Sequence, residues 1–345
     1  MKGNVPLTDE ECTVALSRAR GLGPKLFREL LERFHSPKEI IAAGPRGWQQ
    51  VPGIGPTVVE AIECASEGNG LRRFFDSLEE QAISVSVLQS SDYPQQLKNT
   101  LGSSAPLCLY HKGPLPTRAG VAVVGTRKPT AKGREQAAWF SGELAALGLP
   151  IISGLARGID ACGHRAALHR GGATVAVLGT PIDIVYPPEH RDLAAEICKN
   201  GSLVSEYPPG TATTKGCFPH RNRIIAGLAT TVLIVESGLP SGALNTAWWG
   251  AQLGLDVWTI PGHIDVPQRW GNHQLLKEGA ALALSPGDIA QALGIEHPQT
   301  VQGAAVSIKD LAAMGLTPSQ IVDRTGLKPH VVLAELTKIQ LQLEF

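Results

Sequence analysis

The sequence predicts an α/β protein, built on an extended Rossmann-like doubly wound sheet with smaller helical domains at both ends. The first observation behind this prediction is that short β-branched runs alternate with amphipathic helical segments from about residue 83 onward. The second is that the residues before this point lack such runs and form short helical segments joined by glycine turns. The third is a polar stretch, "EHPQTVQGA", that precedes a final helical segment. We therefore expect a helical domain at 1–82, the sheet domain at 83–295, a linker at 296–304 and a small domain at 305–345.

The length, composition, charge and cysteine count of the chain indicate a folded cytoplasmic protein without a wholly basic surface. Of the 345 residues, 43% are hydrophobic and 18% charged, which is ordinary for a globular chain of more than one domain. The 31 basic and 31 acidic residues cancel, so a nucleic-acid site must come from local clustering of charge. The six cysteines are scattered without metal-ligand spacing, which predicts free thiols in a reducing compartment. The N-terminus lacks a secretory apolar core, and no apolar run reaches the roughly 18 residues that span a bilayer, so we expect no membrane contact.

The helical domain at 1–82 contains a weak internal repeat, "GLGP" at 21–24 and "GIGP" at 53–56. In each copy the glycines permit a tight turn, and the proline suits the first turn of the following helix. This pattern resembles a SAM or helix-hairpin-helix domain, whose loop N–H groups can hold a DNA phosphate. A plain helical turn is the alternative, and the sequence leaves both open.

The sheet domain is predicted to contain nine strands, of which the first two are lead-in strands. The predicted strands are 83–88, 106–111, 121–125, 150–154, 174–179, 202–207, 231–237, 256–262 and 281–285. Helices are predicted between them at 131–147, 159–170, 189–199, 221–228, 243–253, 272–279 and 287–293. Right-handed crossovers would connect these elements into a mostly parallel sheet that is covered on both faces.

The final segment, 305–345, is predicted to form three short helices, the last two in a helix-turn-helix pattern typical of a winged-helix-like domain. Such domains read duplex DNA. The second helix, from Pro329, is however led by His330 and carries mostly apolar residues behind it, which offer little to base edges. A small packing or protein-contact domain is therefore an equal alternative.

Three loops at the carboxyl ends of the predicted strands are rich in small residues and positive charge. Ligands of an open parallel sheet bind beyond these ends. The loops are "GTRKPTAKG", "SGLARGID" and "ESGLPSGALNT". Backbone N–H groups at glycines and helix starts, flanked by arginines, favour phosphate binding. The candidate residues of these loops are Arg127, Lys128, Ser153, Gly154, Arg157, Ser241 and Gly242.

A fourth candidate segment is "FPHRNRIIAG" at 218–227, which places arginines at what looks like the start of a helix. A helix N-terminus carries partial positive charge, so arginines there add repulsion unless an anion lies nearby. The positions of Arg221 and Arg223 therefore predict a bound anion. Phe218 is a candidate for stacking on a base, with burial beside the helix as the alternative.

Nucleotide-cofactor motifs are absent, because Gly125 is not followed by the further glycines of G-x-G-x-x-G and the same loop does not match G-x-x-x-x-G-K-[ST]. We therefore expect no cofactor, no metal and no catalytic residue. An enzyme is the alternative. Asp160 and His164 share a helix face, and Glu206 and Glu236 lie near strand ends, where acid–base pairs are conceivable.

Six segments of the sheet domain resemble, in order, the bacterial DNA-processing protein A family, also called DprA or Smf. They are "VAVVGTRKPT", "ISGLARGIDACGHRAAL", "TVAVLGTPIDIVYPPEHRDL", "SEYPPGT", "FPHRNRIIAGLATTVLIVESGLPSGALNTA" and "VWTIPG" followed by "GNHQLLKEGA". The resemblance covers about residues 84 to 293 and is specific, and both flanking helical parts are also similar to those of the family.

The resemblance implies a single-stranded DNA-binding protein of natural transformation, which protects incoming DNA, helps displace single-strand-binding protein and loads the RecA recombinase. It also implies a homodimer without catalytic activity, whose DNA lies on a basic pocket of the sheet domain. The anion expected at 218–227 is then the phosphate backbone of single-stranded DNA. The implied DNA contacts are Arg127, Phe218, Arg221, Asn222 and Arg223, followed by Ser153, Gly154, Ser241 and Gly242.

The sequence departs from the family pattern at two places. Pro181 stands where the family usually has glycine, which argues against a close ligand approach at that turn. The family's "GxN" reads "GNH" here, so both Asn272 and His273 qualify for that role. The alternative function is a nucleotide-processing enzyme similar to the phosphoribohydrolases, with Glu206 or Glu236 as acid or base. A third hypothesis is that the protein is a scaffold for RecA and binds no nucleic acid.

Overall fold

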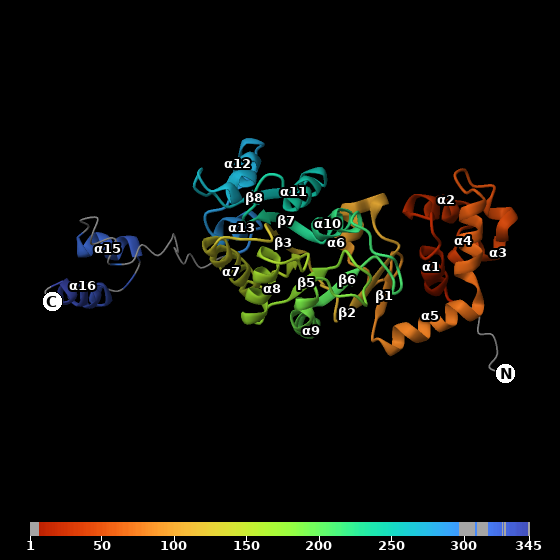
Figure 1. The fold of residues 1–345 in the computed structure, drawn as a ribbon, viewed down its shortest axis with the longest axis horizontal. Coiled ribbons are helices and arrows are strands. Elements are labelled where there is room, and N and C mark those ends of the chain that lie inside the picture. The colour runs from red at the N-terminus through yellow and green to blue at the C-terminus, as the bar shows by residue number, and fades with distance from the viewer. Residues whose placement is uncertain (1–6, 297–307, 309–316, 326, 328, 344–345) are drawn as a thin grey trace. The chain divides into compact units, whose positions relative to one another are not determined.

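The computed structural model describes residues 7–296, 308, 317–325, 327 and 329–343 (Figure 1). The chain divides into two compact units, Met1–Leu282 and Ala283–Phe345. The first unit contains both the N-terminal helices and the sheet, and it ends earlier than the boundary after residue 295 that the sequence predicts. The finer division into domains stays a prediction. In the described residues, no helix combines the length and apolar character needed to cross a membrane.

The N-terminal region is helical, as predicted. Its helices are α1 (Asp9–Ser17), α2 (Pro24–Phe34), α3 (Pro37–Trp48), α4 (Pro56–Ser66) and α5 (Gly68–Glu80). A capping box starts α1: the Glu11 N–H donates to Thr8 Oγ1 at 3.1 Å, and the Thr8 N–H donates to the Glu11 carboxylate at 2.7 Å. Each of α2, α3 and α4 begins with a proline, which suits a position where the backbone N–H has no partner within the helix.

The two glycine turns of this region pack against each other's helices. Gly21 and Gly53 have φ angles of +90° and +89°, which residues with a side chain rarely adopt. A Cβ on Gly21 would lie 3.1 Å from the Val58 side chain, and a Cβ on Gly53 would lie 3.0 Å from the Leu26 side chain. Leu26 and Val58 hold equivalent places in the two copies of the repeat. The sequence repeat is therefore also a structural repeat, in which the two hairpins pack reciprocally.

A nine-stranded sheet forms the centre of the first unit, in the order β1-β2-β6-β5-β4-β3-β7-β8-β9. Its strands are β1 (Ser84–Val87), β2 (Cys108–Lys112), β3 (Gly120–Val124), β4 (Ile151–Ser153), β5 (Thr174–Val177), β6 (Ser202–Ser205), β7 (Ala229–Ile234), β8 (Asp256–Thr259) and β9 (Ala281–Leu282). The pairs β1–β2 and β2–β6 are antiparallel, and all other neighbours are parallel. Every residue of β3, β4, β5 and β6 is buried, as expected of strands covered on both faces. The predicted strands are confirmed, with ends that differ by up to three residues.

Helices cover both faces of the sheet, which confirms the doubly wound fold. They are α6 (Gln95–Leu101), α7 (Ala131–Ala146), α8 (Ile159–His169), α9 (Arg191–Asn200), α10 (Cys217–Gly227), α11 (Gly242–Gln252) and α12 (Trp270–Lys277), with short 3-10 turns η1 (Gly102–Ser104), η2 (Pro188–His190) and η3 (Pro267–Arg269). α8 packs between α7 and α9 on one face, whereas α10 packs against α11 and α6 on the other (Figure 1).

The order of the strands determines where the loops meet. The chain runs from β3 outward to β6 and then returns to β7 on the other side of β3. The loops after β3, β4 and β7 therefore adjoin at the carboxyl edge of the sheet, which is the usual place for a ligand in this architecture. We name these loops, residues 125–130, 154–158 and 235–241, the crown.

The second unit is helical in its described residues. It contains α13 (Pro286–Ala292), α15 (Pro318–Thr325) and α16 (Pro329–Leu343). α15 and α16 pack together through the buried side chains of Ile321 and Val332. These two helices match the last two that the sequence predicts. Residues 297–304 of the predicted linker, and most of the predicted first helix, lie outside the described residues, so the winged-helix-like domain stays a prediction.

Candidate functional site

An open pocket of about 480 Å³ lies beside the crown, at the carboxyl ends of β3 and β4. Two of its walls are crown loops, and a third is the outer surface of α7 and α8. Its most distinctive feature is positive charge. Five basic side chains line it: Arg127, Lys128, Arg134, Arg157 and Arg165.

Among these five cations, Arg157 is the one that pairs with a carboxylate in the described part of the chain. It donates from Nε to Glu189 Oε1, and both side chains are about half exposed. The hydrogen bond and charge of Arg157 lower the pKa of Glu189, and the same hydrogen bond raises the pKa of Arg157. Arg134 donates to the backbone carbonyl of Pro129 at 2.9 Å, which leaves its charge uncompensated. The pocket therefore presents more positive charge than its own protein neighbours neutralise.

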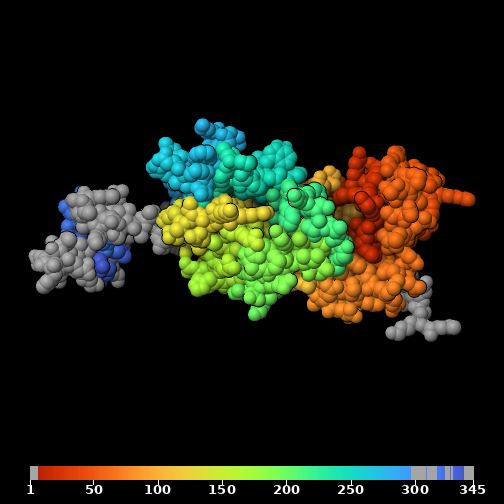
Figure 2. All heavy atoms as spheres, viewed as in Figure 1, coloured from red at the N-terminus to blue at the C-terminus, as the bar shows by residue number. Residues whose placement is uncertain are grey.

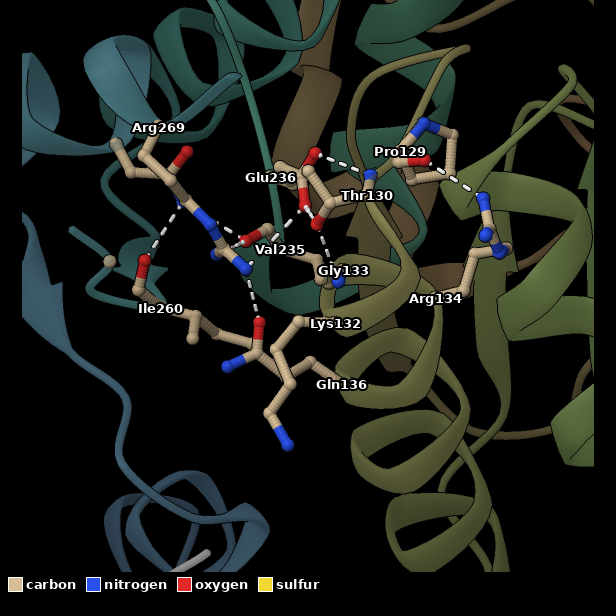
Figure 3. A network of polar contacts seen from close by, with 12 residues as sticks. Pro129, Thr130, Lys132, Gly133, Arg134, Gln136, Val235, Glu236, Ile260 and Arg269 are labelled. Carbon is tan, nitrogen blue, oxygen red and sulfur yellow. Dashed lines mark hydrogen bonds and ion pairs between the residues drawn. The ribbon is translucent and has the colours of Figure 1, made fainter. Parts of the chain in front are cut away.

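The meeting point of the loops after β3 and β7 is filled by a buried carboxylate. Glu236 accepts hydrogen bonds from the Thr130 N–H at 2.9 Å and from Thr130 Oγ1 at 2.7 Å (Figure 3). The Arg269 guanidinium lies 3.5 Å from the same carboxylate and donates to the Val235 carbonyl at 2.5 Å. Gly133 is required here, since a Cβ would lie 1.9 Å from Glu236 Oε2.

This carboxylate stands where dinucleotide-binding folds hold a phosphate. In those folds the phosphate lies at the start of the helix that follows the first strand of the motif. Glu236 supplies its own negative charge at the start of α7, and Thr130 Oγ1 also accepts from the Gly133 N–H at 3.0 Å. The β7 side of the crown is thus closed, and the open pocket lies on the β4 side.

Arg221 lies deeper in its helix than the sequence predicts. α10 begins at Cys217, so Arg221 lies in its second turn and not at its start. The side chain is buried, and Nη1 donates to the carbonyls of Val177 and, at 3.0 Å, Gly154. Burial lowers the pKa of Arg221 to about 10, opposed by the charge of Asp160. Arg221 therefore holds the ends of β5 and β4 through these two carbonyls, and its buried side chain is not open to a ligand.

Arg223 is also buried, and a carboxylate neutralises it. Its Nη2 lies 2.5 Å from Glu206 Oε2, and His220 Nδ1 lies 3.1 Å from the other carboxylate oxygen. Burial alone would raise the pKa of Glu206, but the hydrogen bond from His220 and the charge of Arg223 hold that pKa below its usual value. Protein groups thus already contact both arginines in the second turn of α10, and the binding of an anion by these arginines stays a prediction.

Three further predicted contacts face the protein interior. Ser153 Oγ donates to the Val123 carbonyl at 2.6 Å, and the Gly154 N–H donates to Asp160 Oδ2 at 3.0 Å. Asn222 donates to Asn245 Oδ1 at 3.0 Å. Strand ends and helix contacts therefore already use polar groups of Ser153, Gly154 and Asn222, and their contact with phosphate stays a prediction.

Phe218 lies at the rim of the crown. It is partly buried, it packs against the Gly179 turn, and its ring centroid is 5.7 Å from that of Tyr186. Tyr186 is 44% exposed, so the two rings form a partly open aromatic surface. Ser241 caps α11 by accepting from the Ala243 N–H at 3.3 Å, and Gly242 is exposed, but neither lines the pocket.

Asn272 and His273 differ in their contacts. Asn272 is buried, accepts from the Ser237 N–H at 2.7 Å, and donates to the carbonyls of Ile234, Val235 and Ile260. It ties the ends of β7 and β8 together, whereas the partly buried His273 contacts the Gly262 carbonyl.

Sequence reasoning missed the pocket residues Arg134, Arg165 and His190, and also Glu189, which pairs with Arg157. A signal for Arg165 was present: it lies seven residues after Gly158 on a helix that the sequence predicts, which places both on one face.

The residues considered for catalysis have structural partners. Asp160 is buried and also accepts from the Ala156 N–H at 3.3 Å; burial raises its pKa, against the opposing charge of Arg221. His164 is buried with Nδ1 2.7 Å from Thr174 Oγ1, and burial lowers its pKa to about 3. Within the described residues, no group of three His, Cys, Asp or Glu side chains could hold a metal ion.

Comparison with known proteins gives one consistent result. The sequence profile described as "DNA recombination-mediator protein A" matches residues 84–294. Protein Smf of Synechocystis is 37% identical over 289 residues, which cover 81% of this chain and 72% of that protein. The DNA processing protein DprA of Bacillus subtilis is 34% identical over 244 residues, which cover 68% of this chain and 82% of that protein.

Solved structures of DNA processing protein A have a fold similar to that of this chain. The X-ray structure of DNA processing protein A from Streptococcus pneumoniae superimposes with a TM-score of 0.69 at 31% identity, and covers 85% of this chain and 100% of that one. The protein from Helicobacter pylori, described for its unique single-stranded DNA binding mode, gives a TM-score of 0.53 at 27% identity over 61% of this chain and 95% of that one. The resemblance found in the sequence is confirmed, and the chain belongs to the DNA recombination-mediator protein A family.

Proposed function

We propose that this protein binds single-stranded DNA at the crown and its pocket, protects it and loads RecA recombinase onto it during natural transformation. It displaces single-strand-binding protein in doing so, acts as a homodimer in the cytoplasm, and catalyses no reaction. The observation that carries the proposal is the pocket wall of five cations, of which four have no carboxylate partner among the described residues.

The charge favours a polyanion as the ligand. The chain has no net charge, so this local excess is a specific feature and not a general basic surface. Arg127, Lys128 and Arg157 would neutralise phosphates of the strand and so release the cations condensed on it, which gives a binding constant that falls steeply with salt. The start of α11, at Ser241 and Gly242, offers further N–H groups beyond the closed β7 side.

The aromatic surface favours a single strand over a duplex. Tyr186 lies beside Arg157 and packs against Phe218, and an aromatic ring can stack only on a base whose neighbour has been displaced. The related Helicobacter pylori protein binds single-stranded DNA. In this proposal Ser153, Gly154, Arg221, Asn222 and Arg223 hold the loops in place from below, and the DNA contacts are Arg127, Lys128, Arg157, Phe218, Ser241 and Gly242.

The test is a titration of labelled oligothymidylate and of a duplex of equal length across a salt series, by fluorescence anisotropy. Wild type should prefer the single strand, and Arg127→Gln should reduce the slope of log K against log salt by about 0.7, the value for one lost phosphate contact on a single strand. Arg72→Gln, which removes an exposed charge from α5, is the matched control and should leave the slope unchanged. Equal slopes for wild type and Arg127→Gln would remove Arg127 from the site.

RecA loading is tested in the same samples. Filament formation by RecA on strands coated with single-strand-binding protein should be faster with wild type than without it, and Arg127→Gln should lose most of this effect because loading requires the bound strand. A protein that binds the strand but leaves the filament rate unchanged is a binder and not a loader.

A further inference from the structure

The pocket beside the crown continues along the outer surface of α8. The residues of α8 and its preceding turn that line it are Gly158, Ala161, Cys162 and Arg165. Their spacing of three, four and seven residues places them on one face of the helix. At 1.5 Å per residue, the face from Gly158 to Arg165 is about 10 Å long. Small side chains thus form a shallow floor that leads away from the strand ends and finishes at a guanidinium.

The wall of the pocket that α7 forms, beside this surface of α8, is also cationic. It is formed by Arg134, in the first turns of α7, which packs against α8. Figure 2 presents α7 in yellow directly beside α8 in yellow-green on one open face of the molecule. Burial raises the pKa of the Cys162 thiol, while the charges of Arg165 and Arg134 both act to lower it, which agrees with guanidinium groups on both sides of this thiol. We name the surface formed by Arg134, Gly158, Ala161, Cys162 and Arg165 the α7–α8 groove.

Neither guanidinium of the groove is neutralised by a protein carboxylate in the described residues. Arg134 donates only to a backbone carbonyl, and Arg165 is exposed. Nearby acidic side chains on the same helices are engaged elsewhere, since Glu135 pairs with Lys132 at 3.2 Å and Glu143 pairs with Arg170 at 2.5 Å. The two charges of the groove are therefore available to an external anion.

The closed β7 side of the crown determines the direction in which a bound strand can leave it. Glu236 and Arg269 fill the junction of the β3 and β7 loops, so buried protein side chains occupy that side of the crown. The β4 side has no such obstacle and continues into the groove. A groove of about 10 Å accommodates one to three nucleotides, given a rise of ~3.4 Å per nucleotide in a stacked strand.

We propose that single-stranded DNA leaves the crown along the α7–α8 groove, where Arg134 and Arg165 each neutralise one backbone phosphate. This inference rests on the proposed function and adds a track, with its direction, to the DNA site. The floor of small residues carries no group that reads a base, so the contact is to the backbone and tolerates any sequence.

The experiment compares wild type, Arg134→Gln/Arg165→Gln, Arg127→Gln and the control Arg72→Gln in salt titrations with an oligothymidylate of about 20 nucleotides, which is longer than one binding site. Both groove arginines are exposed, and equal thermal unfolding temperatures confirm that the variants are folded. We expect the double variant to lower the slope of log K against log salt by about 1.4, or 0.7 for each lost phosphate contact. We also expect its number of nucleotides occupied at saturation to fall by one to three.

The outcomes separate this inference from the proposed function. If Arg127→Gln lowers the slope and the double variant does not, the strand binds at the crown but does not follow the groove. If Arg72→Gln lowers the slope as much per charge as the double variant, the effect is one of general charge and the groove is not a track. If wild type itself shows no salt-dependent binding to the single strand, both the inference and the proposed function are wrong.

Discussion

The guanidinium of Arg223 on α10 lies 2.5 Å from the carboxylate of Glu206 at the end of β6, and only 5% and 12% of the two side chains are exposed. This pair, together with His220, fixes the first turns of α10 against the sheet. Because Phe218 and Arg221 belong to the same helix, the pair also sets the position of the aromatic rim and of the brace under the crown.

Replacing Glu206 by Gln should destabilise the protein by about 3 kcal/mol, because it leaves the buried Arg223 without a counter-charge. The pKa of Glu206 is lowered in the folded state, so its stabilising effect is complete above the ordinary pKa of about 4.3 and is lost as pH falls through the lower folded value. Urea unfolding at pH 7.5 and pH 4 should therefore reveal a smaller difference between wild type and Glu206→Gln at the lower pH. A difference that grows toward pH 4 would contradict this assignment.

The same pair gives a test of whether Arg223 touches DNA. Arg223→Gln should reduce stability, while the folded fraction should keep the salt slope of single-strand binding found for wild type, since the guanidinium is already neutralised. The measurement is the slope at a temperature at which the variant is fully folded. A loss of about 0.7 in slope would instead make Arg223 a direct phosphate contact.

Two glycines of α7 should respond in opposite ways to alanine. Gly133→Ala should destabilise by roughly 1–3 kcal/mol, because the new methyl group would lie 1.9 Å from Glu236 Oε2 in a packed region. Gly142→Ala is the control on the same helix: its nearest contact would be at an ordinary 3.4 Å, so the better helix propensity of alanine should stabilise by up to about 1 kcal/mol. Thermal unfolding of both variants checks the signs. A neutral Gly133→Ala would mean that Glu236 can move aside.

Glu189→Gln should strengthen single-strand binding, by up to about fivefold, because it frees Arg157 and removes a negative charge at the pocket rim. Anisotropy titrations at low salt measure the change. Glu143→Gln breaks a comparable ion pair, with Arg170, away from the pocket and should have little effect. If the two variants behave alike, the gain reflects net charge and not the release of Arg157.

The buried His164 should make folding sensitive to mild acid. Thr174 Oγ1 donates to the Ile151 carbonyl at 2.6 Å and so accepts from His164 Nδ1, which leaves Nε2 to take up a proton where it has no hydrogen-bond partner among the described residues. The folded pKa is about 3, whereas an unfolded histidine titrates near 6.5, so below pH 6.5 the unfolded chain binds a proton that the folded chain does not. Stability should therefore fall by roughly 1.4 kcal/mol per pH unit below this value.

The variant His164→Asn keeps a donor toward Thr174 but cannot titrate in this range. Urea unfolding of wild type and variant at pH 7.5, 6.5 and 5.5, values chosen around the ordinary histidine pKa of about 6.5, should reveal the extra loss only in wild type. Parallel losses in both proteins would assign the acid sensitivity to other groups.

The sheet could be predicted because its signal is local. Runs of β-branched residues report burial on both faces wherever they occur, and the loops between them follow in sequence order, so the crown and Arg127, Lys128 and Arg157 could be located. α10 begins at Cys217, four residues before the predicted helix at 221–228, and contains Pro219 in its first turn. Proline is tolerated in the first turn, where its missing N–H has no partner to lose.

The partners of charged side chains could not be predicted, because they come from distant parts of the chain. Arg221 bonds to the carbonyl of Gly154, and Glu236 receives the hydrogen bonds of Thr130, 106 residues away. Sequence spacing identifies which residues carry charge, but only the packed sheet decides whether that charge is neutralised inside the protein or offered to a ligand. Arg221 and Arg223, two arginines of one motif, are buried in the structure, which the sequence alone does not indicate.

The carboxylate of Glu236 gives the crown a ligand-free form that is already ordered. In many nucleotide-binding loops the phosphate itself organises the backbone, and part of the binding free energy is consumed by that ordering. Here Thr130 and Arg269 are held by a group that never dissociates, and Thr130 in turn accepts from the Gly133 N–H. Association with a strand then has no slow folding step to wait for, and its rate should be set by diffusion and by the attraction between opposite charges.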